Sequence, residues 1–111
     1  MLVASSVDAT IDLNLVPALP GAKELLEIGL ESTLAPDNRA VAGKIIIKGK
    51  GITDPSTRLL VDPQTGGGLV FGIQPSEEAA VLEYLKENGF EDATAIGHVI
   101  GESKAPSLEI C

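Results

Sequence analysis

The chain has 111 residues, of which 44% are hydrophobic and 22% charged, and this composition is typical of one soluble globular domain. Its formal net charge of −8 argues against a nucleic-acid surface, which needs clustered lysine and arginine, and against an anionic membrane. No apolar run approaches the ~20 residues of a membrane-spanning helix, and the first residues do not form a secretory signal. The single cysteine, Cys111, cannot form an internal disulfide, which fits a cytoplasmic protein, and we interpret it as a frayed terminal residue.

Residues 9–15 alternate between apolar and polar side chains, after a first stretch that carries little signal. Ile11, Leu13 and Leu15 would face one side of an extended chain and the polar residues the other. This period of two predicts a half-buried strand, which Pro17 ends.

Strong helix formers occupy residues 22–28. Ala22, Leu25 and Ile28 are spaced so that they would share one face of a helix. Gly29 stands where a left-handed C-terminal cap would fall, so the pattern predicts a helix of about two turns.

The next stretch, residues 30–42, is rich in turn-forming residues, and its end at 38–42 is open to either a short helical turn or an irregular link. Arg39 is interpreted either as a solvated surface arginine, the usual case, or as an anion contact or ion pair that fixes this link. Residues 44–48 are rich in isoleucine and are flanked by glycines, which predicts a buried strand.

Two apolar runs, 58–61 and 69–73, predict two further strands. They enclose a glycine-rich loop, residues 62–68, whose sequence is Asp-Pro-Gln-Thr-Gly-Gly-Gly. Three consecutive glycines are unfavourable in any regular element, because glycine loses the most backbone freedom on folding. The loop is therefore expected to follow an unusual backbone path or to allow another group to approach closely.

The chemistry of this loop allows two interpretations. From composition alone we favour an ordinary hairpin or crossover loop that uses glycine for positive φ angles. The alternative is a loop that presents backbone N–H groups to an anion or a nucleotide, with Gln64 and Thr65 adding side-chain donors and acceptors.

A helix is predicted from the segment Pro75-Ser76-Glu77-Glu78, where Ser76 can cap and the two carboxylates favour the positive end of the helix dipole. Asn88-Gly89 closes it. Its apolar face consists of Ala79, Val81, Leu82 and Leu85.

Two strands are predicted after this helix, at residues 93–101 and 107–110. His98 lies in the first of them, and a lone histidine in a strand is more often structural or exposed than catalytic, so we do not count it as a site residue.

The order of elements mixes helices and strands without regular strand-helix-strand alternation. We therefore predict an α+β fold with a mixed, mostly antiparallel sheet and two helices packed on it. No internal repeat or low-complexity segment occurs, so residues 1–111 are expected to form a single domain.

Five segments resemble selenophosphate synthetases (selenide, water dikinases) in the order of that family. Residues 60–70, Leu-Val-Asp-Pro-Gln-Thr-Gly-Gly-Gly-Leu-Val, resemble its "DPQTSGGLL" segment. The others are similar to "IDLxxLPxLPGA", "RNRxYxG", the "PPE" helix with the strand before it, and "IGxV"; here they lie at residues 11–22, 38–43, 73–90 and 95–99. The resemblance runs over about residues 9–101, and five segments in register are far more specific than a glycine triplet alone.

This resemblance implies an enzyme that makes selenophosphate, AMP and phosphate from ATP, selenide and water, with Mg²⁺. It also implies that the chain matches about the last third of such an enzyme, a partial C-terminal domain of the kind found in the aminoimidazole ribonucleotide synthetase superfamily. The family's catalytic cysteine or selenocysteine, its lysine and its metal-binding aspartates belong to segments without a counterpart here. Whether the chain is part of an active enzyme stays open, but we predict that these 111 residues alone do not turn over ATP.

The resemblance also suggests which residues face a ligand. It implies that Asp62, Gln64, Thr65, Gly66, Gly67 and Gly68 form one wall of the nucleotide or phosphate cleft, and that Asn38 and Arg39 lie near it as an anion contact. No catalytic or metal-binding residue is expected in this chain, and Mg²⁺ and ATP are cofactors of the full-length family only. Gly66 departs from the family, which usually has serine there, and this removes a hydroxyl from the loop.

Two further interpretations stay open beside the enzyme fragment. One is a stand-alone, non-catalytic binding or oligomerisation module derived from that domain, and the other is a piece cut from a longer enzyme. We also expect a homo-oligomer or a missing N-terminal domain as partner, because a domain without its first elements would expose an apolar sheet edge or face.

Overall fold

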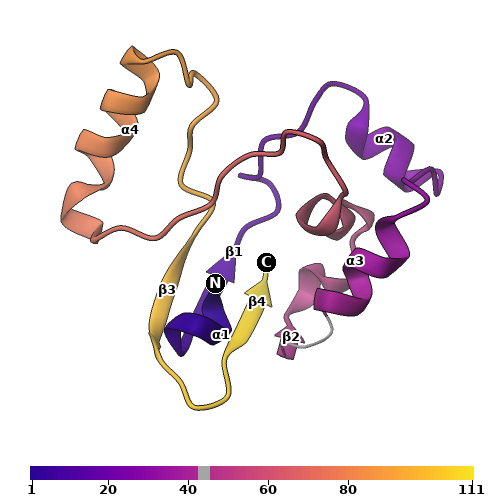
Figure 1. The fold of residues 1–111 in the computed structure, drawn as a ribbon, viewed down its shortest axis with the longest axis horizontal. Coiled ribbons are helices and arrows are strands. Elements are labelled where there is room, and N and C mark those ends of the chain that lie inside the picture. Colours follow the sequence, from indigo (N-terminus) through magenta and orange to yellow (C-terminus); the bar gives the residue numbers. More distant parts are fainter. Residues whose placement is uncertain (43–45) are drawn as a thin grey trace.

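The computed structural model describes residues 1–42 and 46–111 (Figure 1). These described residues form four α-helices, four strands and three short 3₁₀ helices. In chain order they are α1 (Leu2–Ser5), β1 (Val7–Ile11), α2 (Ala22–Glu27), α3 (Ala35–Ala42), β2 (Ile46–Lys48), η1 (Lys50–Thr53), η2 (Pro55–Val61), η3 (Pro75–Glu77), α4 (Glu78–Glu87), β3 (Gly97–Glu102) and β4 (Ser107–Ile110).

The four strands form one mixed sheet in the order β2-β4-β1-β3. β1 pairs with β3 antiparallel, whereas β4 runs parallel to both of its neighbours, β1 and β2. β4 reaches its central position because the turn after β3 carries the chain past β1 (Figure 1). The predicted α+β class with a mixed sheet is confirmed, although two of the three pairings in the described residues are parallel and the antiparallel share is smaller than expected.

The strand predictions were partly right. Residues 107–110 form β4 as predicted, and the strand predicted at 93–101 starts later, at Gly97. The strand predicted at 9–15 lies earlier, at Val7–Ile11, after the short helix α1. Of the strand predicted at 44–48, Ile46–Lys48 is β2, while 44 and 45 lie outside the described residues.

The strand predicted at 58–61 is wrong, because these residues belong to the 3₁₀ helix η2. Pro55 stands at its first turn, and an oxygen of Asp54 accepts a hydrogen bond from the backbone N–H of Ser56 at 2.7 Å. This proline and cap begin a helical turn, and the apolar run simply continues it.

The strand predicted at 69–73 is also wrong, since these residues adopt no regular structure. A strand needs a neighbour to satisfy its backbone groups, and none of the four described strands pairs with this segment. It instead forms an exposed connection toward α4, with the side chain of Leu69 86% exposed.

The helix predictions are confirmed for α2 and α4, and the helical alternative for residues 38–42 is the one that α3 adopts. Gly29 has a φ of 83°, as a left-handed cap requires, but α2 buries Leu26 rather than its predicted face of Leu25 and Ile28. Ser76 was expected to cap α4, which is wrong: the helix begins at Glu78 with no side-chain cap.

The helices pack differently from the prediction. The main contacts of α2 and α3 are with η2, and those of α4 are with η3. In the part of the chain that the structure describes, α2 and α4 make no large contact with the sheet, unlike the predicted pair of helices packed on it. In Figure 1, α2, α3 and η2 lie together on one side and α4 stands apart on the other.

Few side chains are fully removed from water. Outside residues 41–45, the buried apolar residues are Ala9, Leu13, Leu26, Ala35 and Ile110, and of these Ile110 is completely buried. The buried polar residue Ser107 is satisfied by Asp8, whose Oδ1 accepts from the Ser107 backbone N–H at 2.7 Å and from its hydroxyl at 2.9 Å. These hydrogen bonds to Ser107 lower the pKa of the Asp8 carboxyl, since they favour its charged form.

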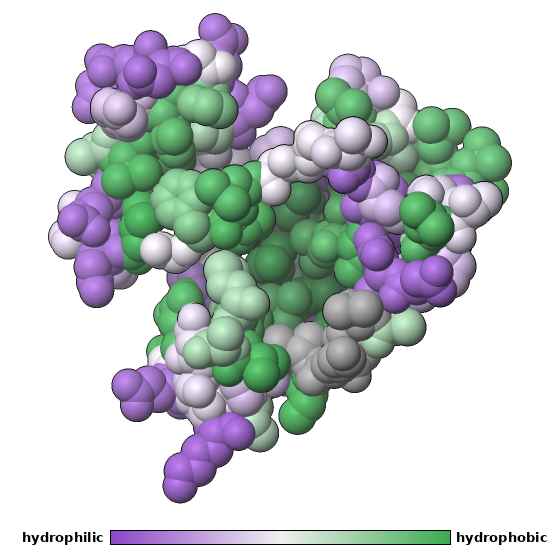
Figure 2. Space-filling model, in the orientation of Figure 1, coloured by the Kyte–Doolittle hydropathy of each residue, from purple (hydrophilic) through white to green (hydrophobic). Residues whose placement is uncertain are grey.

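Much of the remaining apolar surface faces solvent. Figure 2 shows hydrophobic residues gathered around the hollowed middle of one face, between the part that carries α4 and the rest of the molecule. The large apolar residues that the structure exposes include Val70, Phe71, Phe90, Val99 and Ile100. Among the described residues, no helix is both long and apolar enough to span a bilayer.

Candidate functional site

The glycine-rich loop, residues 62–68, leaves η2 and leads into the exposed connection to α4. None of its three glycines has a positive φ, so the interpretation that the triplet supplies positive φ angles is wrong. A Cβ added at Gly66 or Gly68 would meet nothing within 4 Å. Neither the backbone angles nor close packing therefore requires glycine at these two positions, and both leave room for a group outside the chain.

A cavity of about 450 Å³ lies between α3 and the first half of this loop. Asn38 ties the two together, because its Nδ2 donates a hydrogen bond to the backbone oxygen of Val61 at 2.9 Å. Within the loop, Gln64 Nε2 donates to Asp62 Oδ2 at 3.1 Å. The cavity is lined by Leu34, Asn38, Asp62, Pro63, Gln64 and Thr65.

Asn38 and Arg39 were both expected near the glycine-rich loop, but their side chains bind different partners. Asn38 bonds to Val61 at the end of η2, directly before the loop, whereas Arg39 turns to Glu31, in the link between α2 and α3. Its Nη1 and Nη2 donate to the two carboxylate oxygens at 2.6 and 2.9 Å. Of the interpretations considered for Arg39, the ion pair that fixes this link is the one present in the structure.

Arg58 joins the same carboxylate, with its Nε 3.8 Å from Glu31 Oε2, and one of its Nη groups donates to the Leu26 oxygen at 3.2 Å. The hydrogen bond from Arg39 lowers the pKa of Glu31, and the same contact raises the pKa of Arg39. Sequence reasoning missed Glu31, because no local pattern indicates that a glutamate eight residues before an arginine will meet it across a turn.

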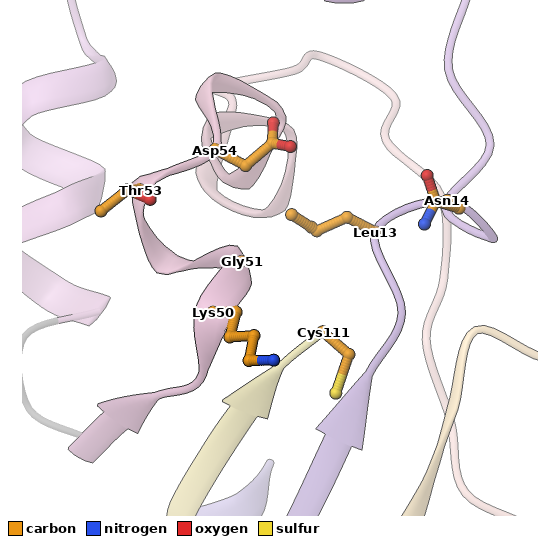
Figure 3. Close-up of a pocket in the computed structure, with 7 residues that line it drawn as sticks. All are labelled: Leu13, Asn14, Lys50, Gly51, Thr53, Asp54 and Cys111. Carbon is orange, nitrogen blue, oxygen red and sulfur yellow. The ribbon is translucent and has the colours of Figure 1, made fainter.

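A second cavity, of about 330 Å³, opens at the carboxyl ends of the parallel strands β1, β2 and β4 (Figure 3). Sequence reasoning missed it as well, because its walls come from three distant segments that only the sheet order brings together. The residues that line it are Leu13, Asn14, Lys50, Gly51, Thr53, Asp54 and Cys111.

Cys111 lies at the edge of this second cavity, and its backbone is not frayed, contrary to expectation. Its N–H donates to the Ile11 oxygen at 2.9 Å, and its oxygen accepts from the Leu13 N–H at 3.2 Å. These two bonds extend the pairing of β1 and β4 by one step, while the thiol itself is exposed.

Side chains that bind metals do not cluster in residues 1–42 and 46–111, where no group of three or more His, Cys, Asp or Glu residues could hold an ion. His98 is exposed and lies across from Thr10, with 3.1 Å between the hydroxyl oxygen and Nδ1.

Comparison with known proteins matches nearly the whole chain to one family. The family described as "AIR synthase related protein, C-terminal domain" matches residues 1–106. A selenide, water dikinase of Pseudomonas straminea is 33% identical over 104 residues, which are 94% of this chain and 29% of that protein. Those of Pelobacter propionicus and Escherichia coli are each 34% identical, over 92% and 90% of this chain. The matched residues are 29% of the length of the Pelobacter propionicus protein and 28% of the Escherichia coli protein. The chain therefore spans under a third of the length of these relatives.

Proposed function

Because the chain belongs to the family of AIR synthase related proteins, C-terminal domain, we propose that it works as part of a selenophosphate synthetase-like enzyme. Such an enzyme converts ATP, selenide and water into selenophosphate, AMP and phosphate. The chain supplies one wall of the cleft that holds the nucleotide or phosphate and is inactive alone. The observation that carries this proposal is the cavity that joins Asn38 of α3 to the glycine-rich loop.

The loop offers the donors that a phosphate group needs. Backbone N–H groups of consecutive residues can converge on an anion, and residues without side chains let its oxygens come within hydrogen-bond distance. Gly66 and Gly68 are open in this way, and Thr65 adds a hydroxyl at the rim of the cavity.

The described residues do not form a Mg²⁺ site of their own. Mg²⁺ takes six oxygen ligands in a nearly octahedral arrangement, usually with one or two carboxylates, and Asp62 is the one carboxylate that lines the cavity. In the proposed enzyme, the rest of a metal site and the reacting groups would come from other parts of the protein.

We expect the isolated chain to bind phosphate, AMP or Mg-ATP weakly, as measured by calorimetric titration with each. Gly68→Val should lower the affinity about tenfold, because the added side chain fills the approach to the loop, and its Cβ meets no atom of the fold within 4 Å. Gly72→Val is the matched control, since its Cβ also meets nothing within 4 Å but it lies beyond the loop.

A wild-type chain that binds none of the three, or equal affinity of wild type and Gly68→Val, would contradict the placement of this loop against the ligand. Selenophosphate formed by the isolated chain would contradict its inactivity.

The exposed apolar surface supports a partner for this chain, either a second copy or the N-terminal domain of the enzyme. Leu69 is 86% exposed and Phe90 62% exposed, and they are two of many large apolar residues that contact water. Exposing so much apolar surface to water is unfavourable, and such surfaces usually mark a contact with a partner. The same observation favours the second candidate function, a non-catalytic oligomerisation module.

For the isolated chain we expect a dimer or larger species in solution. Light scattering coupled to size-exclusion chromatography measures the mass, over a range of concentrations. A mass of 11.5 kDa that persists at high concentration would show a monomer and count against self-association.

A further inference from the structure

Two arginines share a single carboxylate on the side of the molecule that carries α2, α3 and η2. Arg39 comes from α3, Arg58 from η2, and Glu31 from the link between α2 and α3. Both ion pairs found in the described residues involve Glu31. The cluster therefore combines two positive charges with one negative charge, in a chain whose net charge is −8.

The contact between Arg39 and Glu31 has the geometry of an oxyanion complex. Two parallel N–H groups of the guanidinium donate to the two carboxylate oxygens at 2.6 and 2.9 Å. The planar guanidinium binds phosphate with the same two-pronged arrangement. Glu31 thus occupies the position on Arg39 that a phosphate oxygen pair would take.

We propose that Glu31 is an internal competitor for a phosphate-like oxyanion, which displaces it and binds between Arg39 and Arg58. This inference rests on the proposed function and deepens it, because Arg39 lies on α3, the helix whose Asn38 lines the cavity beside the glycine-rich loop, while the Arg39 side chain points to Glu31. An anion held by the arginines would lie at α3, the helix that also forms one side of that cavity.

The exchange requires no rearrangement of the core. The side chains of Arg39, Arg58 and Glu31 are 40%, 38% and 24% exposed, so water and a small anion can reach all three. Ion pairs exposed to this degree contribute little net stability, and a competing anion has little to overcome. Arg58 is held independently of Glu31 by its bond to the Leu26 oxygen at 3.2 Å, which keeps one guanidinium in place while the carboxylate leaves.

The test is titration of inorganic phosphate into the 111-residue chain and its variants, followed by calorimetry at low ionic strength. Glu31→Gln should bind phosphate about fivefold more tightly than wild type, because the competing charge is gone. Glu27→Gln is the matched control: it makes the same change in net charge at an exposed residue of α2, and its affinity should stay within about twofold of wild type. Adding Arg39→Gln to Glu31→Gln should abolish the gain.

Equal phosphate affinity of Glu31→Gln, Glu27→Gln and wild type would overturn the inference and leave the cluster as a purely structural ion pair. Thermal unfolding of each variant checks that it is folded. If Glu31→Gln is unstable, Glu31→Asp replaces it: this variant keeps the charge but shortens the side chain, and its phosphate affinity should rise by less than about fivefold. The two proposals fail separately. If Gly68→Val has no effect, the proposed placement of the loop against the ligand is wrong. If Glu31→Gln has no effect, only the proposed role of Glu31 as a competitor is wrong.

Discussion

Replacement of Gly49 by alanine is expected to destabilise the protein by about 3 kcal/mol or more. Gly49 follows β2 and has φ 106° and ψ 170°, a region of backbone conformation that is essentially restricted to glycine. A Cβ at this position would also overlap the backbone oxygen of Ile110 at the end of β4. The energetic cost of the backbone strain and that of the overlap are expected to be additive. Neither the backbone of residue 49 nor that of β4 can move to relieve them without breaking the parallel pairing of β2 with β4.

Urea-induced unfolding followed by circular dichroism measures this effect. Gly66→Ala is the control, since its Cβ meets no atom within 4 Å and its φ is not positive, so we expect a change within about 0.5 kcal/mol. If Gly49→Ala unfolded at the same urea concentration as Gly66→Ala, the close approach of the turn after β2 to the end of β4 would be wrong.

Truncation of Ile110 to alanine should be the most damaging change in the core, with a loss of about 2–5 kcal/mol. Ile110 is the one completely buried side chain among the described residues, and it lies in β4, the strand that joins β1 to β2. The substitution removes apolar contacts and leaves a cavity in a core that contains few other buried apolar side chains.

The same unfolding measurement tests this prediction. Ile110→Val should lose only about 0.5–1.5 kcal/mol, because it removes a single methyl group. Leu25→Ala, at a helical position that is 50% exposed, should lose less than Ile110→Ala although it removes an equally large side chain. Equal losses at Ile110 and Leu25 would mean that β4 does not form the centre of the core.

The fate of the two apolar runs beside the glycine-rich loop shows the limit of pattern reading. Residues 58–61 read as a strand by composition, but Pro55 and the Asp54 cap begin a 3₁₀ helix that includes them. Residues 69–73 read equally well as a strand and have no neighbour in the described sheet. Composition reports that a segment suits a strand, whereas the strand itself depends on a partner from elsewhere.

The residues proposed for the site show the same dependence on the fold. The resemblance suggested the loop at 62–68 together with Asn38 and Arg39, and the structure ties Asn38 to Val61, the residue just before that loop. It turns Arg39 away to Glu31, which no local signal indicated, because the two residues meet only through the turn between α2 and α3. The cavity at the ends of the parallel strands was equally hidden, since it depends on the order of the strands in the sheet.

The amino-acid sequence by itself determined the helices α2 and α4, the last strand β4, the α+β class and the family. Helices can be read locally because their hydrogen bonds join residues four apart, and the family can be read because its segments keep their order. Only the tertiary structure decided that β4 lies between β1 and β2, that the glycine triplet needs no positive φ, and that Arg39 binds Glu31. The sheet order and the Arg39–Glu31 pair join residues far apart in the chain or across a turn, so their energies depend on the packing of whole elements rather than on any single stretch.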